Sequence, residues 1–216
     1  MPLARLPSMA GEWIATVGNP DQLKTLIQGS FLKGRREPRV AMVGRSNVGK
    51  SSLINALLGT RLAQVSADPG KTRLIHFYAW KEGAKVIADL PGYGFARASQ
   101  AERNKWAELI QSYLEADGNL EAALLLVDSR NGPSRLDREA YDFLKSAGVT
   151  VQIVFTKTDG LKTQKERAER RRDAGVILRE MGLDPEEAVW VSSRSGDRMA
   201  ELVRRVRSWG GEGNDE

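Results

Sequence analysis

The chain has 216 residues, no cysteine, and 33 Lys plus Arg against 28 Asp plus Glu, which gives a net charge of +5 at pH 7 and suits a polyanionic partner such as RNA. This length provides one domain with a full-sized core, and the lack of cysteine excludes disulfides, thiolate metal sites and prenylation. The N-terminus lacks the apolar core of a signal peptide and no apolar run is long enough to span a bilayer, so we expect a cytoplasmic protein with no membrane partner.

Strand-like and helix-like segments alternate along most of the chain. Buried strands are expected at residues 40–43, 73–80, 85–90, 122–127, 151–156 and 188–191, and apolar side chains at 3.6-residue spacing predict helices around residues 52–58, 106–114, 136–147 and 199–206. Ser134, with Asp137 three residues later, is typical of a helix start. The alternation indicates a three-layer α/β fold with a mostly parallel sheet, in which ligands bind at the carboxyl ends of the strands.

Three parts follow from this distribution. Residues 1–36 carry no usable motif and are assigned as an N-terminal extension. Residues 37–209 hold every motif described below and are assigned as the functional domain. Residues 210–216 contain no apolar side chain, so this tail is predicted to be disordered.

The segment from Gly44 to Ser51 lies between the first predicted strand and the first predicted helix, which is the setting of a phosphate-binding P-loop. Its glycines let backbone N–H groups approach the phosphates, and the helix that follows adds its N-terminal dipole. Lys50 brings a positive charge to the β- and γ-phosphates, and the Ser51 hydroxyl is expected to coordinate Mg²⁺. The residues expected to contact the phosphates are Gly44, Arg45, Ser46, Asn47, Val48, Gly49, Lys50, Ser51 and Ser52.

Two later loops complete the predicted phosphate site. After the third strand, Asp89 can hold a water of the Mg²⁺ shell and the Gly92 N–H can contact the γ-phosphate. Thr72, between the first helix and the second strand, is either a second hydroxyl ligand of Mg²⁺ or an ordinary residue at a strand start. Lys50, Thr72 and Gly92 are therefore the predicted catalytic residues. The nucleotide-contacting residues of these loops are Gly70, Lys71, Thr72, Arg73 and Leu74, with Asp89, Leu90, Pro91 and Gly92.

The turn after the fifth strand indicates which base is bound. Guanine presents N1–H and its N2 amine side by side, and the carboxylate of Asp159 can accept both hydrogen bonds. Adenine lacks this donor pair, so the carboxylate would reject it. The stem of Lys157 can lie on the base. The base-binding residues are Thr156, Lys157, Thr158 and Asp159, with Val191, Ser192 and Ser193 after the sixth strand as a weaker source of an N–H for guanine O6.

This arrangement resembles the translation-factor-related P-loop GTPases, and within them the EngB family of bacterial ribosome-assembly GTPases. The resemblance covers roughly residues 37–209 and rests on residues 44–55, 69–72, 89–94, 128–133, 156–159 and 192–193. Residues 89–94 and 128–133 are the family-specific pieces. Thr156, where most GTPases have Asn, also agrees with the EngB pattern.

The resemblance implies a Ras-like fold, with a six-stranded, mostly parallel sheet that has one antiparallel edge strand. It also implies GTP or GDP with Mg²⁺, slow GTP hydrolysis and a role as a molecular switch in assembly of the large ribosomal subunit, through its rRNA and ribosomal proteins. Family members are further described as needed for normal cell division and septation. We expect a monomer that does not bind DNA.

Two positions bear on catalysis. Tyr93 stands where Ras-like enzymes have the Gln that orients the attacking water, so slow intrinsic hydrolysis is predicted. Asn47 stands where related GTPases use an Asn to hold a K⁺ ion; the alternative is a turn-capping Asn. The segments at residues 63–73 and 92–99 are expected to act as switches that the γ-phosphate orders.

Other features allow two interpretations. Basic residues at 167–172 and 204–207 can meet rRNA phosphates, or can be solvated helix faces. His76 is expected to be a half-buried strand residue. The alternative functions are another P-loop GTPase, of the tRNA-modification or signalling type, and a small-molecule kinase, which would not need Asp159.

Overall fold

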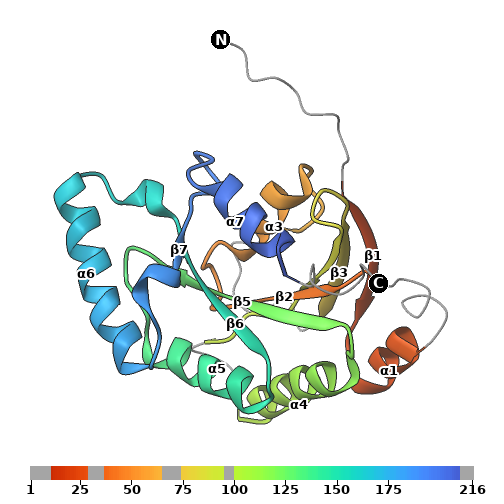
Figure 1. Cartoon of the computed structure of the whole chain (residues 1–216). Helices are drawn as coiled ribbons and strands as arrows, with labels where there is room; N and C mark the ends of the chain where they lie inside the picture. Colours follow the sequence, from red (N-terminus) through yellow and green to blue (C-terminus); the bar gives the residue numbers. More distant parts are fainter. Residues whose placement is uncertain (1–10, 29–36, 65–73, 95–99, 210–216) are drawn as a thin grey trace, which may run out of the picture.

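A computed structural model of the chain describes residues 11–28, 37–64, 74–94 and 100–209, and all statements below refer to them. They form one seven-stranded sheet with helices on both faces (Figure 1). The strands are β1 (Glu12–Val17), β2 (Arg39–Gly44), β3 (Ile75–Trp80), β4 (Lys85–Asp89), β5 (Leu120–Asp128), β6 (Thr150–Thr156) and β7 (Val189–Trp190). Their order in the sheet is β1-β3-β4-β2-β5-β6-β7.

Five neighbouring strands run in the same direction. β4, β2, β5, β6 and β7 are joined by parallel pairings, whereas β3 is antiparallel to both β4 and β1. β2 and β4 are buried along their whole length, as uninterrupted apolar strands covered on both faces should be. The carboxyl ends of these five strands therefore lie at one edge of the sheet. The P-loop and residues 89–92, 128–133, 156–159 and 191–193 lie at those ends, whereas residues 70–74 precede β3 in the sequence.

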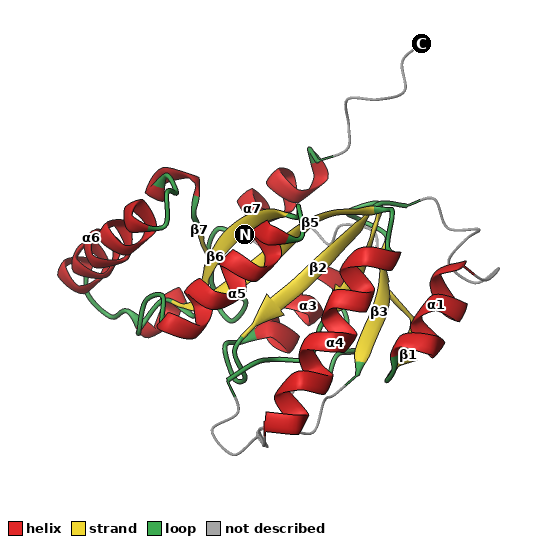
Figure 2. Cartoon of the chain, turned by 90° about the horizontal axis from the view of Figure 1, so that it is seen from below, coloured by secondary structure: helices red, strands yellow, loops and turns green. Residues whose placement is uncertain are grey.

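The helices form two layers with separate cores. The first layer contains α1 (Pro20–Gln28), α4 (Gln100–Ala116), α5 (Arg135–Ser146) and α6 (Gln164–Glu180), which share a buried cluster on one face of the sheet. Figure 2 looks toward the layer that contains α4 and α5. The second layer contains α3 (Lys50–Leu58) and α7 (Met199–Arg207), whose apolar residues pack on the other face.

The predicted three-layer α/β fold is confirmed, but the predicted strand count was wrong by one. β1 was missed, and it covers β3, so the antiparallel strand is not at the edge of the sheet. The β1–β3 register shifts between Trp13 and Ala15, and this irregularity breaks the strict alternation that marks a strand in sequence. Leu23 of α1 is fully buried, so residues of the assigned N-terminal extension add to the main core.

The local helix signals were read correctly. The apolar stripes predicted for residues 106–114, 136–147 and 199–206 fall on α4, α5 and α7. Ser134 and Asp137 form a reciprocal capping box at the start of α5. β3 begins at Ile75, two residues after the predicted start, and the predicted disordered tail at residues 210–216 lies outside the described residues.

Candidate nucleotide-binding site

The P-loop joins the end of β2 to the start of α3, and its glycines are required by its geometry. A Cβ on Gly44 would lie 2.9 Å from Val48 Cγ1 and 3.2 Å from the Leu126 carbonyl oxygen, so no side chain fits there. Gly49 has a φ of 104°, a left-handed conformation that side chains disfavour. Asn47 also has a positive φ, of 63°, and its side chain is exposed. The loop therefore turns tightly into the N-terminus of α3.

Lys50 and Asp89 bring opposite charges together at the end of the P-loop. The Lys50 ammonium forms a salt bridge with the Asp89 carboxylate, and the two side chains are only 12% and 6% exposed. Asp89 ends β4 and stands beside Met42 of β2, so the parallel pairing places this carboxylate next to the loop. Ser51 follows Lys50 in the first turn of α3. A hydroxyl and a carboxylate are oxygen donors that fit a magnesium ion.

The D-x-x-G segment lies directly against the P-loop. The Ser46 N–H donates to the Tyr93 carbonyl oxygen (3.1 Å), and the Tyr93 N–H donates to the Gly44 carbonyl oxygen (3.3 Å). A Cβ on Gly92 would lie 3.2 Å from the Ser46 nitrogen, so the close approach favours glycine at this position. The Gly92 backbone is thus adjacent to the loop that is predicted to hold phosphate.

The side chain of Tyr93 is directed to α5. It is 8% exposed, and its hydroxyl donates to Asp137 Oδ1 at 2.7 Å. Burial, followed by the charge of Asp137 and this hydrogen bond, raises the pKa of Tyr93. Tyr93 therefore remains a neutral donor bound to α5, a role that the sequence did not indicate.

The predicted base-binding turn is anchored to the P-loop and to β7. The Thr156 hydroxyl lies 2.6 Å from the Val48 carbonyl oxygen, which ties β6 to the loop. The Thr158 N–H donates to the Val191 carbonyl oxygen (3.3 Å). Ser192, which is fully buried, donates its hydroxyl to Asp159 Oδ1 at 2.7 Å. This bond fixes the orientation of the Asp159 carboxylate, whose side chain is 27% exposed.

The segment after β7 is only partly suited to the predicted N–H donor role. The Val191 and Ser192 N–H groups donate to the Phe155 and Asp197 carbonyl oxygens, at 2.8 and 3.1 Å. Ser193 is half-buried and lines an open hollow of about 720 Å³ together with Ser52 and Asn55 of α3. Ser193 is thus the member of this trio that faces the same hollow as the P-loop helix.

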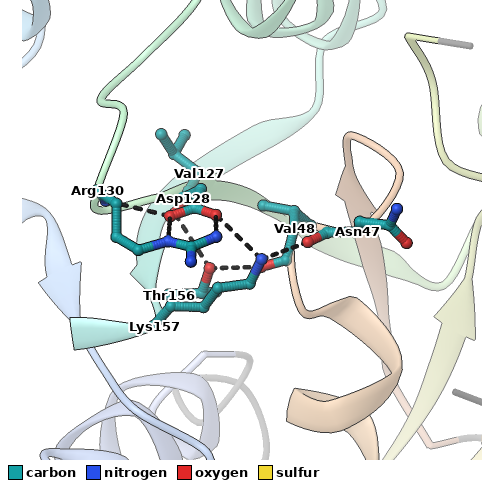
Figure 3. Close-up of polar contacts among 7 residues, drawn as sticks. All are labelled: Asn47, Val48, Val127, Asp128, Arg130, Thr156 and Lys157. Atoms are coloured by element: carbon teal, nitrogen blue, oxygen red, sulfur yellow. Dashed lines mark hydrogen bonds and ion pairs between the residues drawn. The ribbon is translucent and has the colours of Figure 1, made fainter. Parts of the chain in front are cut away.

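Some predicted site residues are not placed. Gly70, Lys71, Thr72 and Arg73 lie outside the described residues, as do most of both predicted switch segments, and Leu74 is 37% exposed. Sequence reasoning also gave no role to Asp128 and Arg130. The structure brings both beside Lys157 (Figure 3), and only their position at the carboxyl end of a parallel strand could have indicated this.

Comparisons with known proteins agree with this geometry. A family model described as a 50S ribosome-binding GTPase matches residues 39–157. A probable GTP-binding protein EngB of Oleidesulfovibrio alaskensis is 49% identical over 142 residues, which cover 65% of each chain. Proteins of the same name from Pelotomaculum thermopropionicum and Streptococcus pyogenes are 39% and 37% identical, over 81% and 86% of this chain and 86% and 91% of theirs.

Solved structures show the same fold. A crystal structure of a probable GTP-binding protein engB is 27% identical with a TM-score of 0.59, over 78% of this chain and 96% of that one. Era of Aquifex aeolicus, bound to GDP·AlF₄⁻, is 27% identical with a TM-score of 0.65, over 82% of this chain and 58% of that one.

Proposed function

Because this chain belongs to the EngB family of GTP-binding proteins, we propose that it is a GTPase that binds GTP and GDP with Mg²⁺, hydrolyses GTP slowly, and acts as a molecular switch in assembly of the large ribosomal subunit. The observation that carries the proposal is the meeting of three parts at one sheet edge. These are the P-loop, the Asp89–Gly92 segment beside it, and the Asp159 carboxylate oriented by Ser192.

In this proposal the P-loop and α3 hold the phosphates. The backbone N–H groups of residues 44–52 surround them, and Lys50 exchanges its contact with Asp89 for the β- and γ-phosphates. The hydroxyls of Ser51 and Thr72 would hold Mg²⁺, and Asp89 would act through one of its waters. When bound, the ion would neutralise charge on the phosphate oxygens. The Gly92 N–H contacts the γ-phosphate, so the segment that follows senses hydrolysis.

Asp159 carries the choice of base and gives the decisive test. Guanine offers two donors to this carboxylate, whereas xanthine offers an acceptor that an amide can satisfy. Asp159→Asn should therefore lose affinity for GDP and gain affinity for XDP, measured by fluorescence titration. Glu139→Gln, which alters an exposed carboxylate of α5, is the matched control. Unaltered GDP affinity in Asp159→Asn would reject the base assignment, and a preference of the wild-type chain for ATP over GTP would reject the GTPase as well.

Slow hydrolysis is proposed because no amide stands where Ras-like enzymes orient water. Tyr93 occupies that position, and its hydroxyl is bound to Asp137. Asn47, with its exposed side chain, is the candidate for holding a K⁺ ion that compensates. Its left-handed backbone equally suits a turn. Equal turnover in Na⁺ and in K⁺ would remove the ion from the mechanism.

The ribosomal role is supported by the description of the matching family and by the excess of basic residues. Era, a structural neighbour at 26% identity, has been solved with MgGDPNP and nucleotides of 16S ribosomal RNA. Several arginines of the two basic helices are used internally: Arg171 lies 5.2 Å from the Trp190 ring centre, and Arg205 donates to Gln152. The charge of these two helices therefore supports a ribosomal partner less strongly than the description of the matching family does.

Co-sedimentation with purified large ribosomal subunits tests this part. Retention with GTP or a non-hydrolysable analogue, and release with GDP, is expected. Equal retention in both states, or none, would refute the switch. We further propose that the protein is needed for cell division and septation because ribosome assembly fails without it. Depletion of the protein should then lower the amount of large ribosomal subunits before septa are lost. No helix in the described part of the chain is long and apolar enough to cross a membrane.

A further inference from the structure

The carboxylate of Asp128, at the carboxyl end of β5, holds two cationic side chains at once (Figure 3). Its Oδ2 atom lies 3.0 Å from Lys157 Nζ. The guanidinium of Arg130 binds both oxygens of the same carboxylate, with Nε 2.9 Å from Oδ1 and Nη2 2.7 Å from Oδ2. The backbone N–H of Arg130 also donates to Oδ1, at 3.1 Å. The Asp128 side chain is only 14% exposed, so its orientation is fixed on three sides.

Lys157 is held at both ends. Its backbone has a left-handed φ of 59°, and its ammonium donates to the Asn47 carbonyl oxygen of the P-loop as well as to Asp128. Between these ends the stem passes over the P-loop: its Cε and Cγ atoms lie 3.5 and 3.9 Å from where a Cβ on Gly49 would stand. The stem therefore lies across the gap between the P-loop and the base-binding turn.

Arg130 connects this pair to the same turn. Its Cδ lies 2.7 Å from where a Cβ on Gly160 would stand, so its methylene groups cover the backbone next to Asp159. The guanidinium is 50% exposed, whereas the carboxylate that it grips is mostly covered. Arg130 thus restrains Asp128 against the turn, and Asp128 in turn restrains Lys157.

We propose that Asp128, restrained by Arg130, is a positioning residue for guanine-nucleotide binding: it holds the Lys157 stem in place as the surface on which the base lies, and so lengthens the residence time of the nucleotide. This inference rests on the proposed function and adds a role for the segment at residues 128–133. A lysine side chain is flexible and loses much rotamer freedom when it is fixed. The Asp128 carboxylate is a second acceptor for Lys157, beside the Asn47 carbonyl oxygen, and it is already held in place. Part of the entropic cost of fixing Lys157 is therefore met before the nucleotide binds.

The test is a double-mutant cycle on the dissociation rate of fluorescent mant-GDP from the full chain. Asp128→Asn removes the charge but retains an oxygen for the Arg130 N–H, so the turn is preserved. Lys157→Met removes the ammonium and keeps an apolar stem. A partly exposed ion pair is worth about 1 kcal/mol, so Asp128→Asn should release mant-GDP about fivefold faster in the wild-type background. In the Lys157→Met background it should have almost no effect.

Controls separate positioning from folding. Glu139→Gln removes one carboxylate of an exposed ion pair on α5 and should leave the dissociation rate unchanged. The nucleotide-free melting temperature of Asp128→Asn should stay close to that of the wild type. If Asp128→Asn does not fold, Arg130→Gln replaces it in the same cycle, because this half-exposed side chain acts through Asp128.

The outcomes are distinct. A full effect of Asp128→Asn in the Lys157→Met background, or no effect in either background, would overturn the positioning role. In both cases the wild-type chain would still bind mant-GDP, so the proposed function would stand. Absence of mant-GDP binding by the wild-type chain would refute the proposed function itself, and the inference with it.

Discussion

Replacing Tyr93 with Phe tests the structural account of the D-x-x-G segment. The substitution keeps the ring and removes only the hydroxyl that donates to Asp137 Oδ1 at 2.7 Å. Asp137 is 2% exposed, and its other oxygen accepts from the Ser134 N–H (2.7 Å) and hydroxyl (2.6 Å). Tyr93→Phe therefore leaves a buried carboxylate with one oxygen short of a donor.

The expected cost follows from that geometry. A hydrogen bond to a charged group contributes about 1.5–3 kcal/mol, so the free energy of unfolding should fall by about 2 kcal/mol. For a domain of this size, each kcal/mol lowers the melting temperature by about 2–4 °C, which gives a decrease of about 4–8 °C. Since the hydroxyl is bound to α5, the rate of GTP hydrolysis should change by less than about threefold.

Urea unfolding, thermal unfolding and single-turnover GTP hydrolysis measure these effects together. Tyr141→Phe is the control, because Tyr141 lies on α5 and its hydroxyl makes no hydrogen bond to another described residue. It should leave stability within about 0.5 kcal/mol of the wild type. An unchanged melting temperature for Tyr93→Phe, combined with a large loss of hydrolysis, would instead put the hydroxyl at the γ-phosphate and contradict its bond to Asp137.

Three further predictions concern other parts of the fold. Asp117→Asn should destabilise the chain by about 3 kcal/mol in urea unfolding, because it breaks a buried ion pair in which Asp117 Oδ1 lies 2.6 Å from the guanidinium of Arg39. A cost below about 1 kcal/mol would contradict a buried pair. Burial lowers the pKa of His76 from 6.5, so the unfolded chain takes up the proton first and the free energy of unfolding should decrease as the pH falls below about 6.5. His76 is the single histidine, so His76→Gln should flatten that slope, which has a limit of about 1.4 kcal/mol per pH unit for one proton; an unchanged slope would assign it to other groups. Ser192→Ala should weaken GDP binding about tenfold in fluorescence titration, because the hydroxyl that lies 2.7 Å from Asp159 Oδ1 and orients this carboxylate is lost. Ser195 is exposed and lies further along the same loop, so Ser195→Ala should change the GDP affinity little. Equal effects of the two substitutions would show that Ser192 does not act through Asp159.

The local structure that agrees with the sequence predictions is encoded by neighbouring residues, whereas the ligand contacts of the site stay predictions. The P-loop is a run of eight residues between a strand and a helix, and its glycines sit where the backbone turns or approaches a neighbour. Ser134 and Asp137, three residues apart, cap the start of α5, so the local sequence was sufficient to predict this helix start. The site residues at 70–73 stay predictions, because they lie outside the described part of the chain.

The features that were missed depend on packing between distant segments. β1 pairs with a strand some 60 residues later, and its apolar and polar residues alternate too irregularly to predict a strand. Tyr93 was interpreted from the position of the Gln in Ras-like enzymes, whereas its partner is 44 residues away on a different layer. Neither partner can be deduced from spacing, because the sheet order and the helix packing decide which side chains meet.

The class of ligand and the order of the loops that would hold it can be deduced from the amino-acid sequence, because phosphate and guanine recognition use short runs of backbone and single side chains. How those loops support one another depends on the fold. Lys157 contacts a carbonyl oxygen 110 residues away and a carboxylate 29 residues away, and β5 and β6 bring them together by pairing in parallel beside β2. The ligand class can therefore be deduced from short stretches of sequence, whereas the contacts that hold Lys157 in place depend on the register of the strands.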